Sequence, residues 1–275
     1  MASFIRIARG SAALIVSMPH TGTELPSDVE PKLVSPWLAR KDADWWIERL
    51  YDFAAARGAT TLRTTMSRTV IDVNRDPSGA SLYPGQATTA LCPTETFDGE
   101  ALYHAGLEPD DTEIARRRRV YFEPYHAALS EEIARLREVH PRVVLYDCHS
   151  IRSIVPRLFD GELPHMNIGT NSGSSCDPQL QYAIETACAA SPFTWIANGR
   201  FKGGWITRHY GRPADGVHAV QMELACRGYM EEPAGPDEEN WPSDYAVEKA
   251  LPMRTVLEEI LASCVEFALA VERRT

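Results

Sequence analysis

The stretch Arg142-Val143-Val144-Leu145-Tyr146-Asp147-Cys148-His149-Ser150 decides the fold class of this 275-residue chain. Four mostly apolar residues after a charged one predict a strand buried on both faces, which is typical of the middle of a parallel sheet. Polar side chains follow at Asp147, His149 and Ser150, where we expect the strand to end. Ligands of open α/β sheets bind at the carboxyl ends of strands, so His149 is a candidate for metal binding or proton transfer.

A second strand-like run has the same ending. Residues 13–18 (ALIVSM) lead directly into Pro19-His20-Thr21-Gly22. A lone histidine at a strand end often only hydrogen-bonds a neighbouring loop, and that alternative applies to each of the two histidines. Two predicted strands that each end in a histidine nevertheless favour one shared site formed by His20 and His149.

Composition narrows the class of protein. With 44% hydrophobic and 24% charged residues, and no run near the roughly 20 apolar residues of a membrane span, we expect a soluble globular protein. The length fits one α/β domain over 1–275. The first ten residues do not resemble a signal peptide, which predicts a cytoplasmic protein. A net charge of -10 argues against a nucleic-acid partner. No prediction of oligomeric state follows.

Hydrophobic periodicity predicts the other elements. We expect helices at 41–51, 113–139, 179–190 and 245–273, and strands at 4–7, 60–65, 67–77, 165–170, 194–197 and 218–225. Residues 78–104 and 198–211 are expected to be loops, the second a mobile lid that carries basic residues over an anion. The run Arg116-Arg117-Arg118-Arg119 is interpreted as a solvated or salt-bridged helix face. The six cysteines include no CxxC pair, which favours free thiols.

Three segments carry further candidates, each with two interpretations. Asp42 and Asp44 begin the predicted helix at 41–51, where acids also serve as caps. Arg68 and Arg75 interrupt the apolar run at 67–77, and a guanidinium is costly to bury without an anion.

Arg75 therefore either pairs internally with Asp72 or Asp76, or joins Arg68 in binding a substrate carboxylate. Glu223 lies in the alternating run at 218–225 and is either an edge residue or a catalytic carboxylate.

Two histidines and a carboxylate, with the fourth position left to water, form the pattern of hydrolytic zinc sites. Zinc lowers the pKa of its water to about 7 and polarises a carbonyl group, while a nearby carboxylate transfers protons. The local HExxH motif of many zinc peptidases is missing from this sequence.

Taken together, the motifs resemble one family, the N-formylglutamate amidohydrolases, also called N-formylglutamate deformylases. The matching stretches are 17–22 (SMPHTG), 42–45 (DADW), 67–68 (SR), 70–76 (VIDVNRD), 147–150 (DCHS), 198–204 (NGRFKGG) and 221–224 (QMEL). They span nearly the whole chain. A more distant likeness reaches the zinc carboxypeptidases and aspartoacylases.

This resemblance implies a three-layer α/β/α fold around a mixed, largely parallel sheet. It implies one divalent metal ion, zinc by preference, with His20, Asp44 and His149 as ligands. Glu24 and Asp42 are rival ligands, because the acid lies 24 positions after His20 and not within the same turn. Asp44 is preferred since it directly precedes Trp45. Asp147 and Ser150 are further candidates, either behind the ligands or as ligands themselves.

By the same resemblance, Glu223 is the general base, and Asn74 and Arg75 hold a substrate carboxylate. Arg68, Arg200, Lys202 and Arg208 are the other available cations. The implied reaction is the hydrolysis of N-formyl-L-glutamate, a small dicarboxylate, to L-glutamate and formate, the last step of a histidine degradation route. One alternative is a metal-dependent deacylase or carboxypeptidase acting on another N-acyl amino acid or peptide. The other is a non-catalytic anion-binding protein on the same fold.

Overall fold

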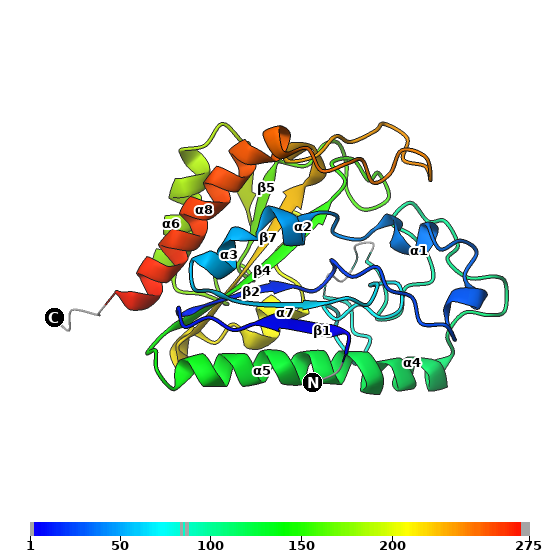
Figure 1. The fold of residues 1–275 in the computed structure, drawn as a ribbon, viewed down its shortest axis with the longest axis horizontal. Helices are drawn as coiled ribbons and strands as arrows, with labels where there is room; N and C mark the ends of the chain where they lie inside the picture. Colours follow the sequence, from blue (N-terminus) through cyan, green and yellow to red (C-terminus); the bar gives the residue numbers. More distant parts are fainter. Residues whose placement is uncertain (1–2, 83–84, 86–87, 271–275) are drawn as a thin grey trace.

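A mixed sheet runs through the computed structural model, which describes residues 3–82, 85 and 88–270 (Figure 1). Its strands in these residues are β1 (Ile5–Ala8), β2 (Leu14–Met18), β3 (Thr60–Thr64), β4 (Val143–Ile151), β5 (Met166–Gly169), β6 (Trp195–Ala197) and β7 (Val217–Ala225). Their spatial order is β1-β3-β2-β4-β7-β5-β6. All neighbours are parallel except β1 with β3 and β5 with β7. The predicted mixed, largely parallel sheet is confirmed.

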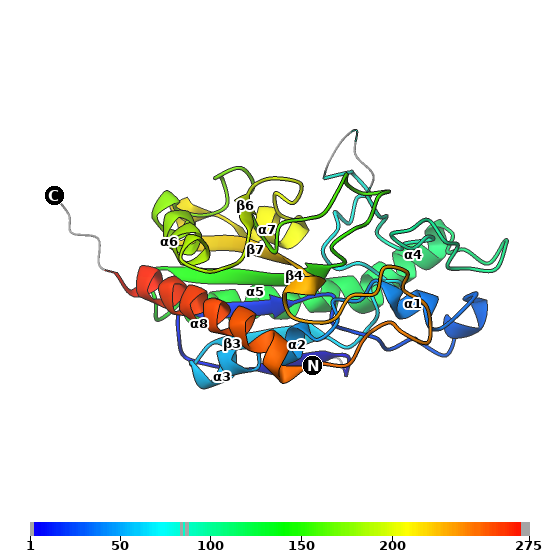
Figure 2. The same ribbon diagram turned by 90° about the horizontal axis from the view of Figure 1, so that it is seen from above.

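Helices cover both faces of the sheet. They are α1 (Leu38–Lys41), α2 (Ile47–Leu50), α3 (Phe53–Ala56), α4 (Asp111–Arg117), α5 (Glu123–Arg137), α6 (Pro178–Ala189), α7 (Trp205–Tyr210) and α8 (Val247–Leu269). Short 3-10 turns lie at Glu30–Lys32, Pro213–Asp215 and Cys226–Gly228, and a π-helical turn at Arg118–Phe122 joins α4 to α5. Helices α2, α3, α6 and α8 lie on one face and α4, α5 and α7 on the other (Figures 1 and 2). The three-layer α/β/α prediction is confirmed.

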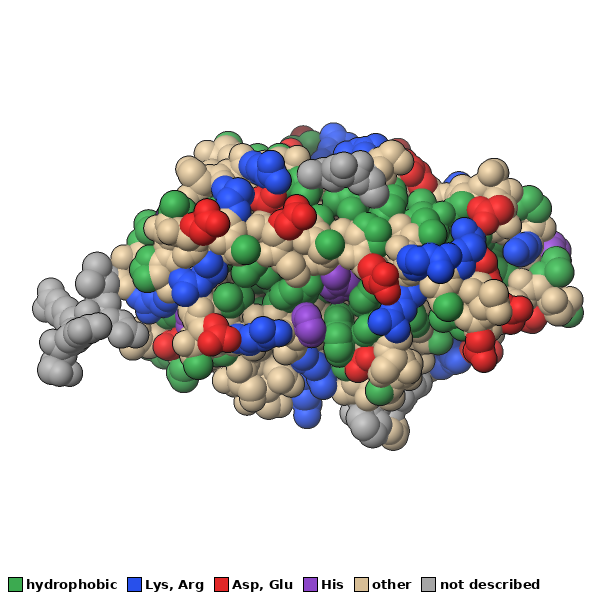
Figure 3. Space-filling model, turned by 90° about the horizontal axis from the view of Figure 1, so that it is seen from below, with side chains coloured by type: hydrophobic (Ala, Val, Ile, Leu, Met, Phe, Trp, Pro, Cys, Tyr) green, Lys and Arg blue, Asp and Glu red, His purple; other side chains and the backbone are tan. Residues whose placement is uncertain are grey.

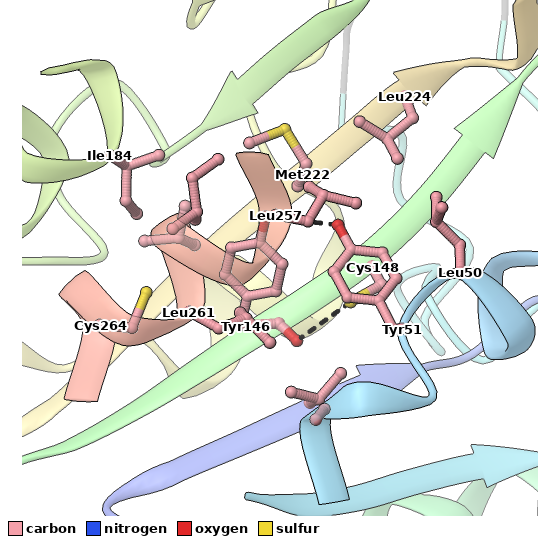
Figure 4. Close-up of a cluster of buried hydrophobic side chains, with 14 of the residues drawn as sticks. Leu50, Tyr51, Tyr146, Cys148, Ile184, Met222, Leu224, Leu257, Leu261 and Cys264 are labelled. Atoms are coloured by element: carbon pink, nitrogen blue, oxygen red, sulfur yellow. Dashed lines mark hydrogen bonds between the residues drawn. The ribbon is translucent and has the colours of Figure 1, made fainter. Parts of the chain in front are cut away.

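The centre of the sheet is its most deeply buried part. Every residue of β4 and β7 is buried, as the apolar run at the start of β4 predicts. On one face, Tyr146 of β4 packs against Tyr51, and Leu257 and Leu261 of α8 close the cluster (Figure 4). This packing fixes the two strands whose far ends carry His149 and Glu223.

The predicted end of the central strand was too early. Strand β4 continues through Asp147, His149 and Ser150, and pairs with β7 as far as Ile151 opposite Ala225. The physical reason is that β7 runs equally far and pairs with every residue of β4. His149 therefore lies inside the strand, close to its carboxyl end.

The predicted helix at 41–51 forms only in part, because its first half is a connection between two short helices. Helix α1 ends at Lys41 and α2 begins at Ile47, so Asp42 and Asp44 lie in the connection between them. Trp46 has a φ of 63°, which a non-glycine residue adopts only under outside constraint. Its indole Nε1 donates to the Ser243 carbonyl oxygen at 2.9 Å, and tertiary contacts thus override the helical pattern.

Two further segments differ from the prediction. Residues 67–77 form turns instead of a strand, although Val70, Ile71 and Val73 are buried as an apolar run requires. The expected mobile loop at 198–211 contains helix α7. Parts of two predicted elements, residues 83–84 and 86–87 of the loop at 78–104 and 271–273 of the last helix, lie outside the described residues.

The four-arginine run is only partly a salt-bridged face. Arg116 pairs with Asp28 and Glu113, as expected, but Arg117 is fully buried. Its guanidinium donates to Glu113, to the Tyr103 hydroxyl and to the Val70 carbonyl oxygen, so it holds the 67–77 segment against α4. On the face seen in Figure 3, basic side chains lie beside acidic ones instead of gathering into one patch.

Other whole-chain features can be read directly. All six cysteines are free and buried. In the part of the chain that the structure describes, no helix combines the length and the apolar character that a membrane crossing requires.

Arg117→Lys should lower the free energy of unfolding by about 1–3 kcal/mol, since a lysine cannot replace all three donations and leaves buried acceptors unpaired. The exposed Arg119→Lys variant is the matched control and should stay within about 0.5 kcal/mol of wild type. Urea unfolding of the three proteins measures both values. Equal stability of the two variants would show that the buried arginine does not stabilise the fold.

Candidate functional site

Three ligand-type side chains from three separate segments meet at the carboxyl ends of the central strands. His149 Nδ1 lies 3.0 Å from Asp44 Oδ2 and 3.1 Å from His20 Nδ1, and His20 Nδ1 lies 3.6 Å from the same carboxylate oxygen. All three side chains are buried. Strands β2 and β4 are parallel neighbours, which brings the histidines together, and Asp44 is held by its backbone N–H, which donates to the His20 carbonyl oxygen at 3.0 Å.

Two further carboxylates fix the orientation of the imidazole rings. His20 Nε2 lies 2.7 Å from Asp72 Oδ1, and His149 Nε2 lies 2.8 Å from Asp147 Oδ2. An ionised carboxylate only accepts, so we infer that each Nε2 carries a proton and donates it to its carboxylate; the Asn74 amide nitrogen also lies 3.0 Å from His149 Nε2. In neutral rings both Nδ1 lone pairs then face Asp44 Oδ2. Burial alone would raise the pKa of Asp44, but His20 and His149, when protonated, outweigh burial and hold this pKa below its ordinary value. Burial alone would lower the pKa of His149, but Asp147 and Asp44 raise it well above its ordinary value.

This arrangement suits a cation. Three lone-pair atoms lie within 4.8 Å of one another in a buried place. Asp44 Oδ1 has no hydrogen-bond partner among the described residues, although Arg68 Nη1 lies 3.6 Å from it. Two imidazoles and one carboxylate match the donor set of zinc sites with an open position, and a carboxylate behind each imidazole is the usual support. The buried group of His20, Asp44 and His149 could therefore hold a metal ion.

The rival acids do not join this group. Glu24 accepts a hydrogen bond from the Thr65 hydroxyl at 2.7 Å. Asp42 accepts from the Phe97 backbone N–H at 2.7 Å and lies 3.6 Å from Arg152, and its burial raises its pKa to about 6. Ser150 is buried and its hydroxyl has no hydrogen-bond partner within the described residues.

Asp72 is the functional-site residue that the sequence interpretation missed. It is fully buried and binds His20, the Asn74 backbone N–H at 2.9 Å and Arg68 Nη2 at 2.7 Å, while Arg75 lies 3.7 Å away. Burial alone would raise the pKa of Asp72, but Arg75, His20 and Arg68 hold it well below its ordinary value. The sequence did give one signal for Asp72, because an internal ion pair with Asp72 was one of the two interpretations of Arg75. The structure contains this pair.

Asn74 connects several parts of this site. Its Nδ2 donates to Asp147 Oδ2 at 3.1 Å, and its Oδ1 accepts from the Ile206 backbone N–H at 2.7 Å. The Asn74 side chain, to which the resemblance assigns substrate binding, therefore hydrogen-bonds β4 and α7 in this structure. Substrate contact through Asn74 stays a prediction.

A pocket opens beside the two histidines. It is lined by His20, Arg68, Asn74, Arg75, Thr88, Thr89, Phe97, His149, Ile151, Leu158, Arg200, Phe201, Gly204, Gln221 and Glu223. Three of the predicted substrate-binding arginines line it, while Arg208 does not, and its Nε donates to the Gly203 carbonyl oxygen at 2.8 Å. Lys202 is exposed and does not line the pocket.

Glu223 lies beside His149 in the sheet, at the registered position on β7. The alternative of an edge residue is wrong, because β7 pairs with β4 on one side and β5 on the other. Burial raises the pKa of Glu223 to about 7. A carboxyl group with this pKa can both accept and return a proton near neutral pH.

Comparison with known proteins adds a family to this geometry. The model of the family described as N-formylglutamate amidohydrolase matches residues 12–230. The N-formylglutamate deformylase of Pseudomonas aeruginosa is 46% identical over 264 residues, which cover 96% of both chains. A protein of the same name from Pseudomonas putida is 45% identical over 254 residues, 92% of both chains.

Two solved structures share the fold. A crystal structure of N-formylglutamate amidohydrolase from Ralstonia eutropha JMP134 has a TM-score of 0.79 at 23% identity, with 97% of this chain and 98% of that chain covered. A gene product from Agrobacterium tumefaciens has a TM-score of 0.71 at 17% identity, with 96% and 94% covered. At these identities the likeness concerns the fold alone.

His126 is a buried histidine that contacts both the 67–77 segment and the end of α7. His126 of α5 donates through Nε2 to the Val73 carbonyl oxygen at 2.8 Å, and its Nδ1 lies 2.9 Å from the Tyr210 hydroxyl at the end of α7. Burial lowers its pKa to about 4, whereas an unfolded histidine has a pKa of about 6.5.

Between these two pH values the unfolded chain binds more protons at His126 than the folded one. Its contribution to stability is therefore complete above about pH 6.5 and lost as the pH falls toward 4, by roughly 2–4 kcal/mol. His126→Gln should flatten the curve of unfolding free energy against pH by this amount. Replacing the exposed His104 with Gln is the control, and a similar flattening in both variants would contradict the assignment.

Proposed function

Since the chain belongs to the N-formylglutamate amidohydrolase family, we propose that it hydrolyses N-formyl-L-glutamate to L-glutamate and formate with the help of a divalent metal ion. The observation that carries this proposal is the similarity, over nearly the full length, to two proteins named N-formylglutamate deformylase. The buried donor group beside a carboxylate and a cationic pocket supports it. The reaction would be the last step of a histidine degradation route.

The ion would be held by His20, Asp44 and His149, with zinc preferred because of the donor set. When bound, it would supply a Lewis acid for the formyl carbonyl group and lower the pKa of a water molecule. Asp72 and Asp147 keep the two imidazole rings in the orientation that presents Nδ1. The three donor atoms already lie within 4.8 Å of one another.

The proton transfers are assigned to Glu223. It lines the pocket beside His149 and would take a proton from the attacking water, then deliver it to the leaving nitrogen of glutamate. One carboxylate thus serves first as a base and then as an acid. A pKa of about 7 for Glu223 suits both steps.

The two carboxylates of the substrate require cations on the pocket wall. We assign them to Arg75 and Arg200, which line the pocket. Arg68 also lines the pocket, but its guanidinium binds Asp72 and stacks on Phe97. We therefore assign Arg68 to holding Asp72 and not to binding a substrate carboxylate. A planar guanidinium suits bidentate binding of a carboxylate.

A substrate panel tests the proposed function. We expect kcat/KM for N-formyl-L-glutamate to exceed that for N-acetyl-L-glutamate and N-formyl-L-aspartate by about tenfold or more, the discrimination that one methyl or methylene group typically allows. Chelation should abolish turnover, and added zinc should restore it. Equal rates on the acetyl compound would favour a broader deacylase, and full activity of verified metal-free protein would remove the metal from the proposal.

Glu223→Gln should fold and bind metal normally, because the amide preserves size and most packing. Its turnover number should fall by about two to four orders of magnitude, since it cannot accept the proton. Steady-state kinetics together with metal analysis of the purified variant measure both properties. Near-normal turnover with full metal content would exclude Glu223 from the mechanism.

A further inference from the structure

Gln221 is a buried polar residue that lines the pocket but has no role in the proposed mechanism. It lies two positions before Glu223 on β7, so both side chains point to the same face of the sheet. Both line the pocket, and both are buried. Gln221 Nε2 donates to Glu223 Oε2 at 3.0 Å. Within the described residues, this is the one hydrogen bond of the Glu223 carboxylate.

The orientation of the Gln221 amide follows from its second partner. The Gly204 backbone N–H lies 2.7 Å from Gln221 Oε1, and a backbone N–H can only donate. The oxygen of the amide must therefore face Gly204. Its NH2 group is left facing Glu223, so the amide donates to the carboxylate and cannot be flipped without losing both bonds.

The donor that sets this orientation is itself immobilised. Gly204 precedes α7, whose first backbone N–H groups, from Trp205 and Ile206, donate to the carbonyl oxygen and side-chain Oδ1 of Asn74. A Cβ atom at Gly204 would lie 2.5 Å from Asn74 Nδ2, so only glycine places its N–H here without a shift. The N–H group that orients Gln221, and through it Glu223, thus belongs to an immobilised part of the backbone.

We propose that Gln221 is a positioning residue that holds Glu223 by one oxygen and leaves the other oxygen for the proton transfers. This inference rests on the proposed function, because it concerns the residue that carries the protons there. The hydrogen bond from Gln221 fixes the rotamer of Glu223 and so keeps the free oxygen in one direction. A purely structural Gln221 would serve only as acceptor for the Gly204 N–H.

Gln221→Glu separates these two roles. The new carboxylate can still accept from Gly204, but when ionised it cannot donate to Glu223 and repels it. We expect kcat on N-formyl-L-glutamate to fall by about tenfold to a hundredfold at pH 7, with KM within about threefold of wild type. The acid limb of the kcat profile should move up by about one pH unit, and bound metal should be unchanged.

Two further variants control this result. Gln221→Met loses both hydrogen bonds without adding charge and should reproduce the fall in kcat. Asn167→Ala removes another buried amide next to Glu223 and should leave the pH profile in place. Among the described residues, the Asn167 amide donates only to the Glu223 and Pro164 carbonyl oxygens.

Wild-type kinetics keep the two proposals apart. If the wild-type protein does not hydrolyse N-formyl-L-glutamate, the proposed function is wrong and this inference is lost with it. If wild type is active and Gln221→Glu matches its kcat and pH profile, only the inference about Gln221 is overturned. A Gln221→Glu variant that loses metal along with activity would likewise overturn it, since the residue would then act on the ion site.

Discussion

The site depends on the contact between each imidazole Nε2 and the carboxylate behind it. Asp72 and Asp147 accept the Nε2 protons of His20 and His149, and this leaves both Nδ1 atoms facing Asp44. Three lone-pair atoms in a buried place repel one another unless a proton or a cation lies among them. Asp72 and Asp147, which do not belong to the donor group, therefore create the need for a positive charge among its three atoms.

The same two carboxylates connect the donor group to the rest of the pocket. The Asn74 backbone binds Asp72, and its side chain binds Asp147 and the first turn of α7. The residue before α7, Gly204, binds Gln221, which in turn binds Glu223. Hydrogen bonds, joined through the backbone of residues 204–206, thus connect the donor group to the carboxylate assigned to proton transfer.

Hydrophobic pattern predicted the buried central strands, the helices and the α/β class, because buried strands and amphipathic helices leave a local signal. The three layers and the mixed sheet were implied by the family resemblance. Hydrophobic pattern could not predict the left-handed turn at Trp46, where a hydrogen bond to Ser243 overrides a helical pattern. The motifs predicted which residues gather around His20, but the importance of Asp72 depends on partners that only the folded turns bring together. Similarly, Arg117 was indistinguishable in sequence from its exposed neighbours.

His20, Asp44 and His149 are proposed to hold a divalent ion, and anomalous diffraction tests this proposal most directly. Crystals of protein loaded with one equivalent of zinc, measured on both sides of the zinc absorption edge, should show one dominant anomalous peak. We expect this peak within about 2.0–2.3 Å of both Nδ1 atoms and an Asp44 oxygen. A dominant peak at any other residues, or none in protein shown to contain zinc, would contradict it.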